Sequence, residues 1–263
     1  MSERVRSSNH PWGTLVELCA PEVRNALDAD AVAALSALFA ADSVDDDGVV
    51  LLAAEGPVFC AGGDVGVLSA AAGVGELGPL FTASATAFAD LVESIVSCPR
   101  PVVAVVQGAA VGGGLSLALA CDVRIASSSA RLVPGWSHWG LPPDGCASAL
   151  LALALGPSRA RSLLVAGEEL AADSPLAPLV FSAVVPEEAL RAAGVAEAQR
   201  LAALPGARAA KAVTRSLLLS SLRAQREVEL VELARAAADP AVVAALNSAG
   251  GAPDELRRSS LPR

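Results

Sequence analysis

Hydrophobic residues form short continuous runs in the first half of the chain, interrupted by glycine, proline or charged residues. The runs Val49–Ala54, Pro101–Val106 and Val123–Ala126 are mostly apolar and bounded by turn residues, which predicts buried β-strands. Between these runs, apolar positions at helical spacing predict helices over about Asp28–Ala41 and Ser84–Ser97. This alternation of strands and helices predicts an α/β fold with parallel strand pairs.

The pattern changes after Gly156, where helical spacing replaces the short apolar runs. Helices are predicted over Pro157–Leu164, Glu187–Leu204 and Ala207–Ala238, and the last of them presents a leucine-rich stripe. An amphipathic stripe of this kind is typical of a helix that packs on a neighbour. We therefore expect the end of the chain to be mainly helical.

These patterns divide the chain into three segments. Residues 1–11 are expected to form a flexible leader before a first strand at Gly13–Leu18. Residues 12–198 are expected to form the core, and residues 199–263 the C-terminal helical region. Within the core, Val65–Pro79 is rich in alanine and glycine and is expected to be a loop.

Two glycine segments each follow a predicted strand and carry the candidate chemistry. Gly112, Gly113 and Gly114 open a predicted helix, where unobstructed N–H groups favour an anion or a developing oxyanion. An isolated glycine run also serves to let a helix pack closely on its strand. The second segment, Phe59–Asp64, adds N–H groups beyond the end of another strand. Together the two segments predict an oxyanion hole with two backbone donors.

Composition restricts the classes of function. The 263 residues are 53% hydrophobic and 3% aromatic, enough to bury a large aliphatic core. The formal net charge of −9 argues against binding to nucleic acid or to an anionic membrane. The N-terminus lacks the pattern of a signal peptide, and apolar runs are interrupted before ~18 residues. We therefore expect a cytoplasmic protein that binds neither nucleic acid nor membrane.

The cysteines lie apart in apolar surroundings without CxxC spacing, which predicts buried free thiols rather than disulfides or a metal site. They are Cys19, Cys60, Cys98, Cys121 and Cys146. The sequence contains no metal-ligand cluster and no dinucleotide-binding fingerprint, so neither a metal nor a redox cofactor is expected.

Four motifs occur in order along the chain: RNALD at Arg24–Asp28, FCAGGD at Phe59–Asp64, QGAAVGGGLSLALACDVRIAS at Gln107–Ser127 and LGPSRARSLLVAGEEL at Leu155–Leu170. Together they resemble the enoyl-CoA hydratase/isomerase (crotonase) superfamily. The resemblance implies a crotonase-like ββα spiral core and a C-terminal helical region that builds homotrimers or dimers of trimers. It also implies an acyl-coenzyme A thioester as the substrate, with no further cofactor.

The resemblance also assigns roles to particular residues. Those implied are the oxyanion donors Gly63 and Gly113, the acyl-pocket residues Ala61, Ser116 and Trp136, the coenzyme A contacts Arg24, Ala26 and Lys211, and the acidic residue Asp144. Arginine suits a phosphate group because its forked donors match phosphate oxygens. A solvated surface arginine is the alternative interpretation of Arg24.

Two positions depart from the hydratase pattern. Hydratases of the family use two glutamates to add water across the double bond, and this chain has Ser116 and Trp136 at those positions. A serine hydroxyl is too weakly basic to replace a carboxylate as general base near neutral pH. Ordinary hydration is therefore disfavoured. Trp136 also disfavours the simple enoyl isomerases, which keep the second glutamate.

Asp144 is the remaining carboxylate that the motifs place near the acyl group. Some relatives have an aspartate here: dienoyl-CoA isomerases use it as an acid/base, and 4-chlorobenzoyl-CoA dehalogenases use it as a nucleophile. The dehalogenases also have a tryptophan at the position of Trp136, but their catalytic histidine falls near Ala89. A simple helix N-cap is another role for Asp144. Asp144-centred chemistry is favoured, and the alternatives are dehalogenase-like catalysis and a non-catalytic acyl-CoA-binding or assembly subunit.

Overall fold

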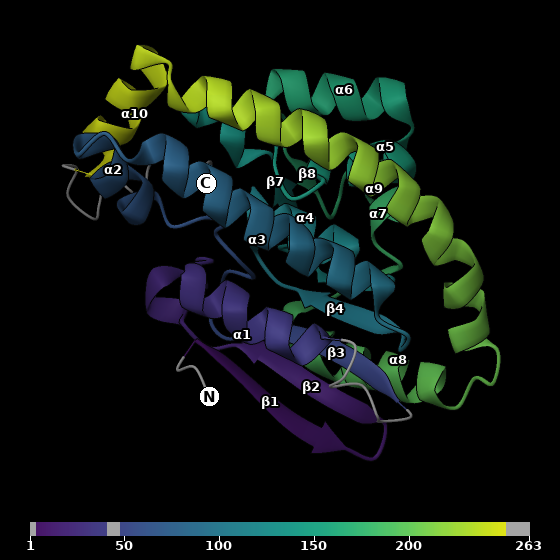
Figure 1. Ribbon diagram of the computed structural model, residues 1–263. Helices are drawn as coiled ribbons and strands as arrows, with labels where there is room; N and C mark the ends of the chain where they lie inside the picture. The colour runs from purple at the N-terminus through teal and green to yellow at the C-terminus, as the bar shows by residue number, and fades with distance from the viewer. Residues whose placement is uncertain (1–3, 41–47, 251–263) are drawn as a thin grey trace.

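The computed structural model describes residues 4–40 and 48–250. Its main sheet has the strand order β1-β2-β3-β4-β6-β9, and all neighbours are parallel except the antiparallel pair β1 and β2. Figure 1 shows β1, β2, β3 and β4 below the helix α3 (Leu77–Ser97). The strands are β1 (Val5–His10), β2 (Gly13–Leu18), β3 (Val49–Ala54), β4 (Val102–Val106), β6 (Val123–Ser127) and β9 (Ala183–Val185). The predicted α/β class with parallel strand pairs is confirmed.

The prediction of a flexible leader over residues 1–11 is wrong for Val5–His10, which forms the edge strand β1. Val5 pairs with Leu18 and is 3% exposed, whereas the other residues of the strand are half-buried or exposed. A strand with a single apolar residue shows no hydrophobic alternation. Its pairing partner in β2, rather than its own pattern, therefore determines that it is a strand.

Successive residues of the central strands face opposite sides of the sheet and build two hydrophobic layers. Leu52 faces the side that is covered by α1 (Ala29–Phe39) and α3 (Leu77–Ser97). Leu51 faces the other side, which is covered by α8 (Leu190–Ala202). The sheet is thus buried on both faces, as expected for parallel strands.

Further helical segments surround these layers. They are η1 (Pro21–Val23), α2 (Val65–Gly73), α4 (Gly113–Ala120), η3 (Gly135–Trp139), α5 (Ala147–Leu155), α6 (Pro157–Ala166), α7 (Ala177–Val180), η4 (Glu187–Ala189), α9 (Ala207–Ala237) and α10 (Pro240–Gly250). The helices predicted after Gly156 are confirmed, with 187–204 divided between the short turn η4 and α8.

α2 lies in the segment predicted to be a loop, Val65–Pro79. Asp64 caps this helix, because its Oδ1 accepts the N–H groups of Gly66 at 2.8 Å and Val67 at 3.3 Å. An aspartate cap stabilises a helix by about 1 kcal/mol, and the alanines that follow have high helix propensity. The loop prediction is therefore wrong for most of this segment.

Three short strands form a second sheet. β5 (Ala109–Val111) runs parallel to β7 (Arg131–Val133), which runs antiparallel to β8 (Leu170–Ala171). Strands this short give too little alternation to be predicted from the sequence. β5 carries the chain from β4 to the glycines that open α4.

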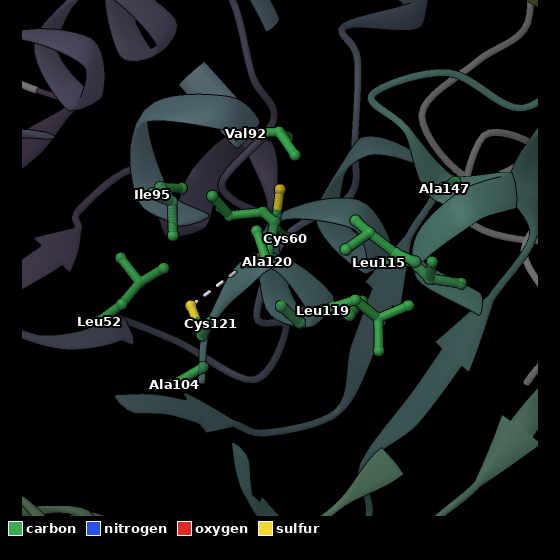
Figure 2. Close-up of a cluster of buried hydrophobic side chains, with 14 of the residues drawn as sticks. Leu52, Cys60, Val92, Ile95, Ala104, Leu115, Leu119, Ala120, Cys121 and Ala147 are labelled. Atoms are coloured by element: carbon green, nitrogen blue, oxygen red, sulfur yellow. Dashed lines mark hydrogen bonds between the residues drawn. The ribbon is translucent and has the colours of Figure 1, made fainter. Parts of the chain in front are cut away.

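α4 lies inside the core, and all of its residues are buried. Figure 2 shows Leu115 and Leu119 of this helix in the same cluster as Leu52, Ile95 and Ala147, which come from β3, α3 and α5. A helix that is apolar on every side belongs in the interior. Packing on all sides therefore fixes the position of its glycine-rich N-terminus.

The C-terminal helices pack on the core. α9 lies along α3 and contacts α5, and α10 folds back onto α2 (Figure 1). The boundary predicted between residues 198 and 199 falls inside α8, because Ala198 and Leu201 both pack on the sheet. α8 thus belongs to the core, and the C-terminal layer consists of α9 and α10.

α3 is long and apolar enough to cross a membrane by length and composition alone, and it is the one such helix within residues 4–40 and 48–250. Its Leu91, Val92 and Ile95 are fully buried in the core, and the helix packs against α1 and α9. Its apolar character is explained by this packing in the core.

Candidate active site

The two glycine segments lie side by side because a parallel β-bridge joins Cys60 to Ala110. The Cys60 N–H donates to the carbonyl oxygen of Ala109 at 3.2 Å, and the Val111 N–H donates to the carbonyl oxygen of Cys60 at 2.9 Å. A Cβ atom at Gly114 would lie 2.4 Å from the Cys60 carbonyl oxygen. Glycine at this position therefore permits the close approach of the two segments.

The N–H groups of Gly63 and Gly113 are unpaired in this arrangement. Gly113 is the first residue of α4, so its N–H has no acceptor within the helix, and Gly112 supplies no side-chain cap. Neither N–H makes a hydrogen bond within the described part of the chain. A Cβ atom built on Gly62 would lie 3.1 Å from the nitrogen of Gly113, which shows how closely the segments meet. The geometry suits the predicted two-donor site.

Asn25 is a structural residue that sequence reasoning missed. It is 3% exposed with a φ angle of 54°, and its side chain bonds the Ala20 N–H and the carbonyl oxygens of Glu55 and Val58, each at 2.9 Å. These bonds attach the RNALD turn to the loop after β3. The signal in the sequence is the asparagine itself, because this residue type tolerates positive φ and bonds nearby backbone.

Arg24 and Ala26 lie on this turn beside the first glycine segment. The Arg24 carbonyl oxygen accepts the N–H of Ala61 at 3.0 Å, so the backbone of the turn touches the predicted acyl pocket. All three residues are half-buried. The Arg24 guanidinium forms no ion pair with any residue that the structure describes, which leaves it available to an anionic ligand.

Trp136 and Asp144 form a hydrogen-bonded pair beside the N-terminus of α4. The indole Nε1–H of Trp136 donates to Oδ1 of Asp144 at 2.9 Å, and the Ser116 hydroxyl donates to the Asp144 carbonyl oxygen at 3.0 Å. A Cβ atom on Gly112 would lie 3.7 Å from the same indole nitrogen. Ser116 is fully buried, so it supports the loop of Asp144 rather than lining an open pocket.

The N-cap interpretation of Asp144 is wrong. The N-cap of α5 is Cys146, which has φ of 61° and makes no side-chain capping bond. The Asp144 carboxylate instead accepts the indole N–H. Burial raises its pKa to about 6, and the hydrogen bond from Trp136 opposes this rise by favouring the charged form. A carboxylate with this pKa is largely ionised at neutral pH and is suited to accept a proton.

Phe88 connects these elements. A Cβ atom on Gly113 would lie 3.3 Å from the Phe88 ring, and one on Gly145 would lie 2.2 Å from it. The N-terminus of α4 and the turn after Asp144 therefore meet at the same aromatic ring of α3.

Glu229 is a second carboxylate near Asp144 that the sequence analysis did not identify. It lies on α9 and is 5% exposed. Its Oε2 accepts the Cys146 N–H at 2.7 Å, and its Oε1 accepts the Ser148 N–H at 3.1 Å and the Ser148 hydroxyl at 2.5 Å. Leu222 and Leu233 share its helical face and are also buried. A charged residue at a core position of a helical repeat is the signal that could have revealed it.

Lys211 does not fit the predicted coenzyme A contact. Its ammonium group is buried and donates to the carbonyl oxygens of Ile95 at 3.3 Å and Arg100 at 3.0 Å, and to Oδ2 of Asp122 at 2.7 Å. The same Asp122 oxygen accepts the Val102 N–H at 2.7 Å. These bonds occupy the three donors of the ammonium group, so Lys211 fastens α9 to the core and the prediction of a ligand contact is wrong.

Lys211→Met is expected to lower the free energy of unfolding by about 3 kcal/mol, because removing one partner leaves the other buried charge uncompensated. Asp122 is 32% exposed, which places the effect at the lower end of the usual range. Urea unfolding measures it, with Arg235→Met in an exposed ion pair of the same helix as the control. Equal stability of Lys211→Met and the wild type would contradict this structural role.

The cysteines are free thiols, as predicted, and four of them are buried while Cys19 is half-buried. Burial raises the pKa of Cys60, Cys121 and Cys146 to about 12, so these thiols stay protonated. Within residues 4–40 and 48–250, no group of His, Cys, Asp and Glu side chains is arranged to hold a metal ion.

Comparison with known proteins gives two relatives that bear on this site. The chain is 38% identical over 154 residues to the "probable enoyl-CoA hydratase EchA14" of Mycobacterium tuberculosis strain H37Rv, which covers 58% of each protein. It is 30% identical over 171 residues to "4-chlorobenzoyl coenzyme A dehalogenase-1" of an Arthrobacter species, covering 65% of this chain and 62% of that protein. The matched part of the chain thus spans less than two thirds of either relative's length.

The structure and the family model agree with these similarities. An enoyl-CoA hydratase crystal structure from Mycobacterium avium subsp. paratuberculosis K-10 has 27% identity and a TM-score of 0.82, covering 94% of this chain and 98% of that chain. This likeness confirms the predicted crotonase-like fold. The family model described as enoyl-CoA hydratase/isomerase matches residues 14–239. The chain therefore belongs to the enoyl-CoA hydratase/isomerase family.

Proposed function

We propose that this protein is an enzyme that polarises the carbonyl of an acyl-coenzyme A thioester between the N–H groups of Gly63 and Gly113, with Asp144 as the acid/base. The observation that carries this proposal is the Trp136–Asp144 hydrogen bond at 2.9 Å. It lies beside the N-terminus of α4, where the Gly113 N–H has no acceptor within the helix. The Asp144 carboxylate accepts this bond and does not cap α5. Family membership supports the acyl-CoA substrate.

The chemistry follows from the two parts of the site. Ionised Asp144 removes a proton from a carbon conjugated with the thioester carbonyl, and negative charge develops on the carbonyl oxygen. Two N–H donors stabilise this enolate, and each such donor is typically worth about 3 kcal/mol in the transition state. Return of the proton from Asp144 to another carbon shifts the double bond. Proton and electron pair both remain within the substrate and the carboxyl group, so the step is an isomerisation.

Ser116 and Trp136 are assigned supporting roles in this proposal. The Ser116 hydroxyl is committed to the Asp144 carbonyl oxygen, and Trp136 donates to the carboxylate. Neither replaces the glutamates of a hydratase, so water addition is expected to be slow. Ala61 is assigned to the wall of the acyl pocket, next to Gly62.

Arg24 and Ala26 are assigned to coenzyme A binding. Their turn touches the glycine segment through the Ala61 N–H, and the Arg24 guanidinium is available to a phosphate. We further assign the protein to the cytoplasm and to a homotrimer or a dimer of trimers. Exposed apolar residues of α9 support packing against a second copy: they are Val213, Leu217, Val228 and Val231.

A second candidate function is nucleophilic attack by Asp144 on an aryl-CoA, which the Trp136–Asp144 contact and the dehalogenase relative support. Hydrolysis of the ester formed in that reaction needs a general base near the acyl group. Ala89 occupies the position on α3 where the resemblance implies a histidine, and it is 2% exposed. The acid/base role of Asp144 is therefore the preferred function.

Activity assays with enoyl-, dienoyl-, aryl- and malonyl-type CoA thioesters test the proposal. We expect turnover of at least one isomerisable thioester and poor hydration of crotonyl-CoA, because both glutamates are absent. Efficient hydration of crotonyl-CoA would contradict isomerisation as the reaction, and release of halide from an aryl-CoA would favour the second candidate. Binding of thioesters without turnover of any would indicate a non-catalytic subunit.

Calorimetry tests the ligand separately. A CoA thioester is expected to bind more tightly than the corresponding free acid, and Arg24→Ala is expected to weaken the binding about tenfold or more through loss of a charge-assisted bond. Arg161→Ala, at an exposed arginine of α6, is the matched control. Equal affinity for thioester and free acid would contradict the coenzyme A site.

A further inference from the structure

The N-terminus of α5 has an unusual cap. Cys146 stands at the N-cap position and provides no side-chain acceptors for the N–H groups at the start of the helix. Glu229 of α9 supplies them from 83 residues away, with its two carboxylate oxygens on the Cys146 and Ser148 N–H groups. The Asp144 carboxylate makes no such bond, and the carbonyl oxygen of Asp144 accepts the Ala147 N–H at 3.2 Å.

We propose that Glu229 is a positioning residue for Asp144: it occupies the N-terminus of α5, so that the Asp144 carboxylate faces Trp136 instead of capping the helix. This inference rests on the proposed function for its catalytic meaning. Aspartate is among the preferred caps, and a helix N-terminus attracts the nearest carboxylate. Asp144 lies two residues before Cys146 and four before Ser148, so it is the nearest carboxylate in sequence to their N–H groups once the Glu229 carboxylate is removed.

The surroundings of Glu229 explain why its carboxylate is directed at α5. Arg226, one turn earlier on α9, bonds Asp90 at 2.7 Å and Glu93 at 3.1 Å on α3 and makes no ion pair with Glu229. The Glu229 carboxylate therefore accepts hydrogen bonds from Cys146 and Ser148. Burial raises the pKa of Glu229 to about 7, the three bonds favour its charged form, and the negative charge of Asp144 opposes ionisation.

The Trp136 indole N–H reports directly on the position of Asp144. The chain has three tryptophans, so a protein labelled with 15N-tryptophan gives three indole signals, and Trp136→Phe identifies the one that matters. In Glu229→Gln we expect the Trp136 indole proton to move upfield and to exchange with solvent at least tenfold faster. The signals of Trp12 and Trp139 are expected to stay in place.

Glu227→Gln is the matched control, because it makes the same change at an exposed position of the same helix. If Glu229 only stabilises α5, Glu229→Gln lowers the unfolding midpoint but leaves the Trp136 signal unchanged, and this result would overturn the inference. Should Glu229→Gln fail to fold, Ser148→Ala removes one donor to Oε1. A smaller shift, confined to the Trp136 indole signal, is then expected. If that signal does not shift, the proposal is wrong.

The measurement requires no substrate, which separates this inference from the proposed function. A Trp136 signal that responds to Glu229→Gln in a protein without thioester turnover would leave the positioning role intact and remove the enzymatic assignment. If the protein turns over a thioester but the Trp136 signal does not respond to Glu229→Gln, the enzymatic assignment stands and the positioning role of Glu229 is wrong.

Discussion

Asp144→Asn is expected to lower kcat on the isomerised thioester by about 100- to 10,000-fold, the usual contribution of one general acid/base group. The affinity for the CoA thioester is expected to stay within a few-fold, because the oxyanion donors and Arg24 are unchanged. Asparagine keeps an oxygen that can accept the Trp136 indole N–H. Steady-state kinetics together with calorimetry therefore separate chemistry from binding.

The pH dependence adds a second test of the same group. Because the folded pKa of Asp144 is about 6, kcat/KM is expected to fall below pH 6 as the general base becomes protonated, and to level off above it. The wild type should show this decrease of kcat/KM below pH 6, and the residual activity of Asp144→Asn should not. The same decrease in the variant would assign the general base to another residue.

Stability distinguishes loss of chemistry from loss of fold. The folded pKa of Asp144 is raised above its ordinary value of 3.8, so its contribution to stability is present below about pH 4 and is lost as the pH rises through 6. Asp144→Asn removes this unfavourable ionisation. We therefore expect the variant to be at least as stable as the wild type at pH 7.5 in urea unfolding, and full activity in a stable variant would exclude Asp144 from the reaction.

Gly113→Pro is expected to lower kcat by about 100- to 1,000-fold, the usual loss when one oxyanion donor is removed. Proline lacks the N–H, and the first position of a helix is where it is best tolerated. The substitution also adds a Cβ atom at 3.3 Å from the Phe88 ring, which has to move by a few tenths of an ångström. A loss of kcat with little change in thioester affinity is the expected pattern.

Gly113→Ala provides the matched comparison, because it adds the same Cβ atom and keeps the N–H. The ratio of the two kcat values then measures the donor alone. Equal kcat values for the alanine and proline variants, with both proteins folded by circular dichroism, would show that the N–H of Gly113 takes no part in the reaction.

Local patterns in the sequence predicted the parts of the fold that depend on neighbouring residues. The buried strands β3, β4 and β6 are short apolar runs, and the glycines that open α4 leave N–H groups unpaired wherever that helix is placed. The two glycine segments also predicted two sets of backbone donors, since the first follows β3 and the second follows β4 through the short strand β5. These features need only secondary structure and the rule that adjacent parallel strands end at the same edge.

The tertiary structure decided the features that depend on residues distant in the chain. The resemblance assigns Lys211 to coenzyme A, whereas folding places it against Asp122, 89 residues earlier. The helix-cap alternative for Asp144 is wrong because Glu229, 83 residues beyond Cys146, bonds the N-cap N–H. Val5–His10 is predicted to belong to a leader, but its pairing with β2 makes it the strand β1. A buried polar group takes whichever partner the packing brings within hydrogen-bond distance. The partners of each carboxylate and of the lysine were therefore determined by tertiary contacts, whereas the buried strands β3, β4 and β6 and the glycine-rich N–H donors were determined by the local sequence.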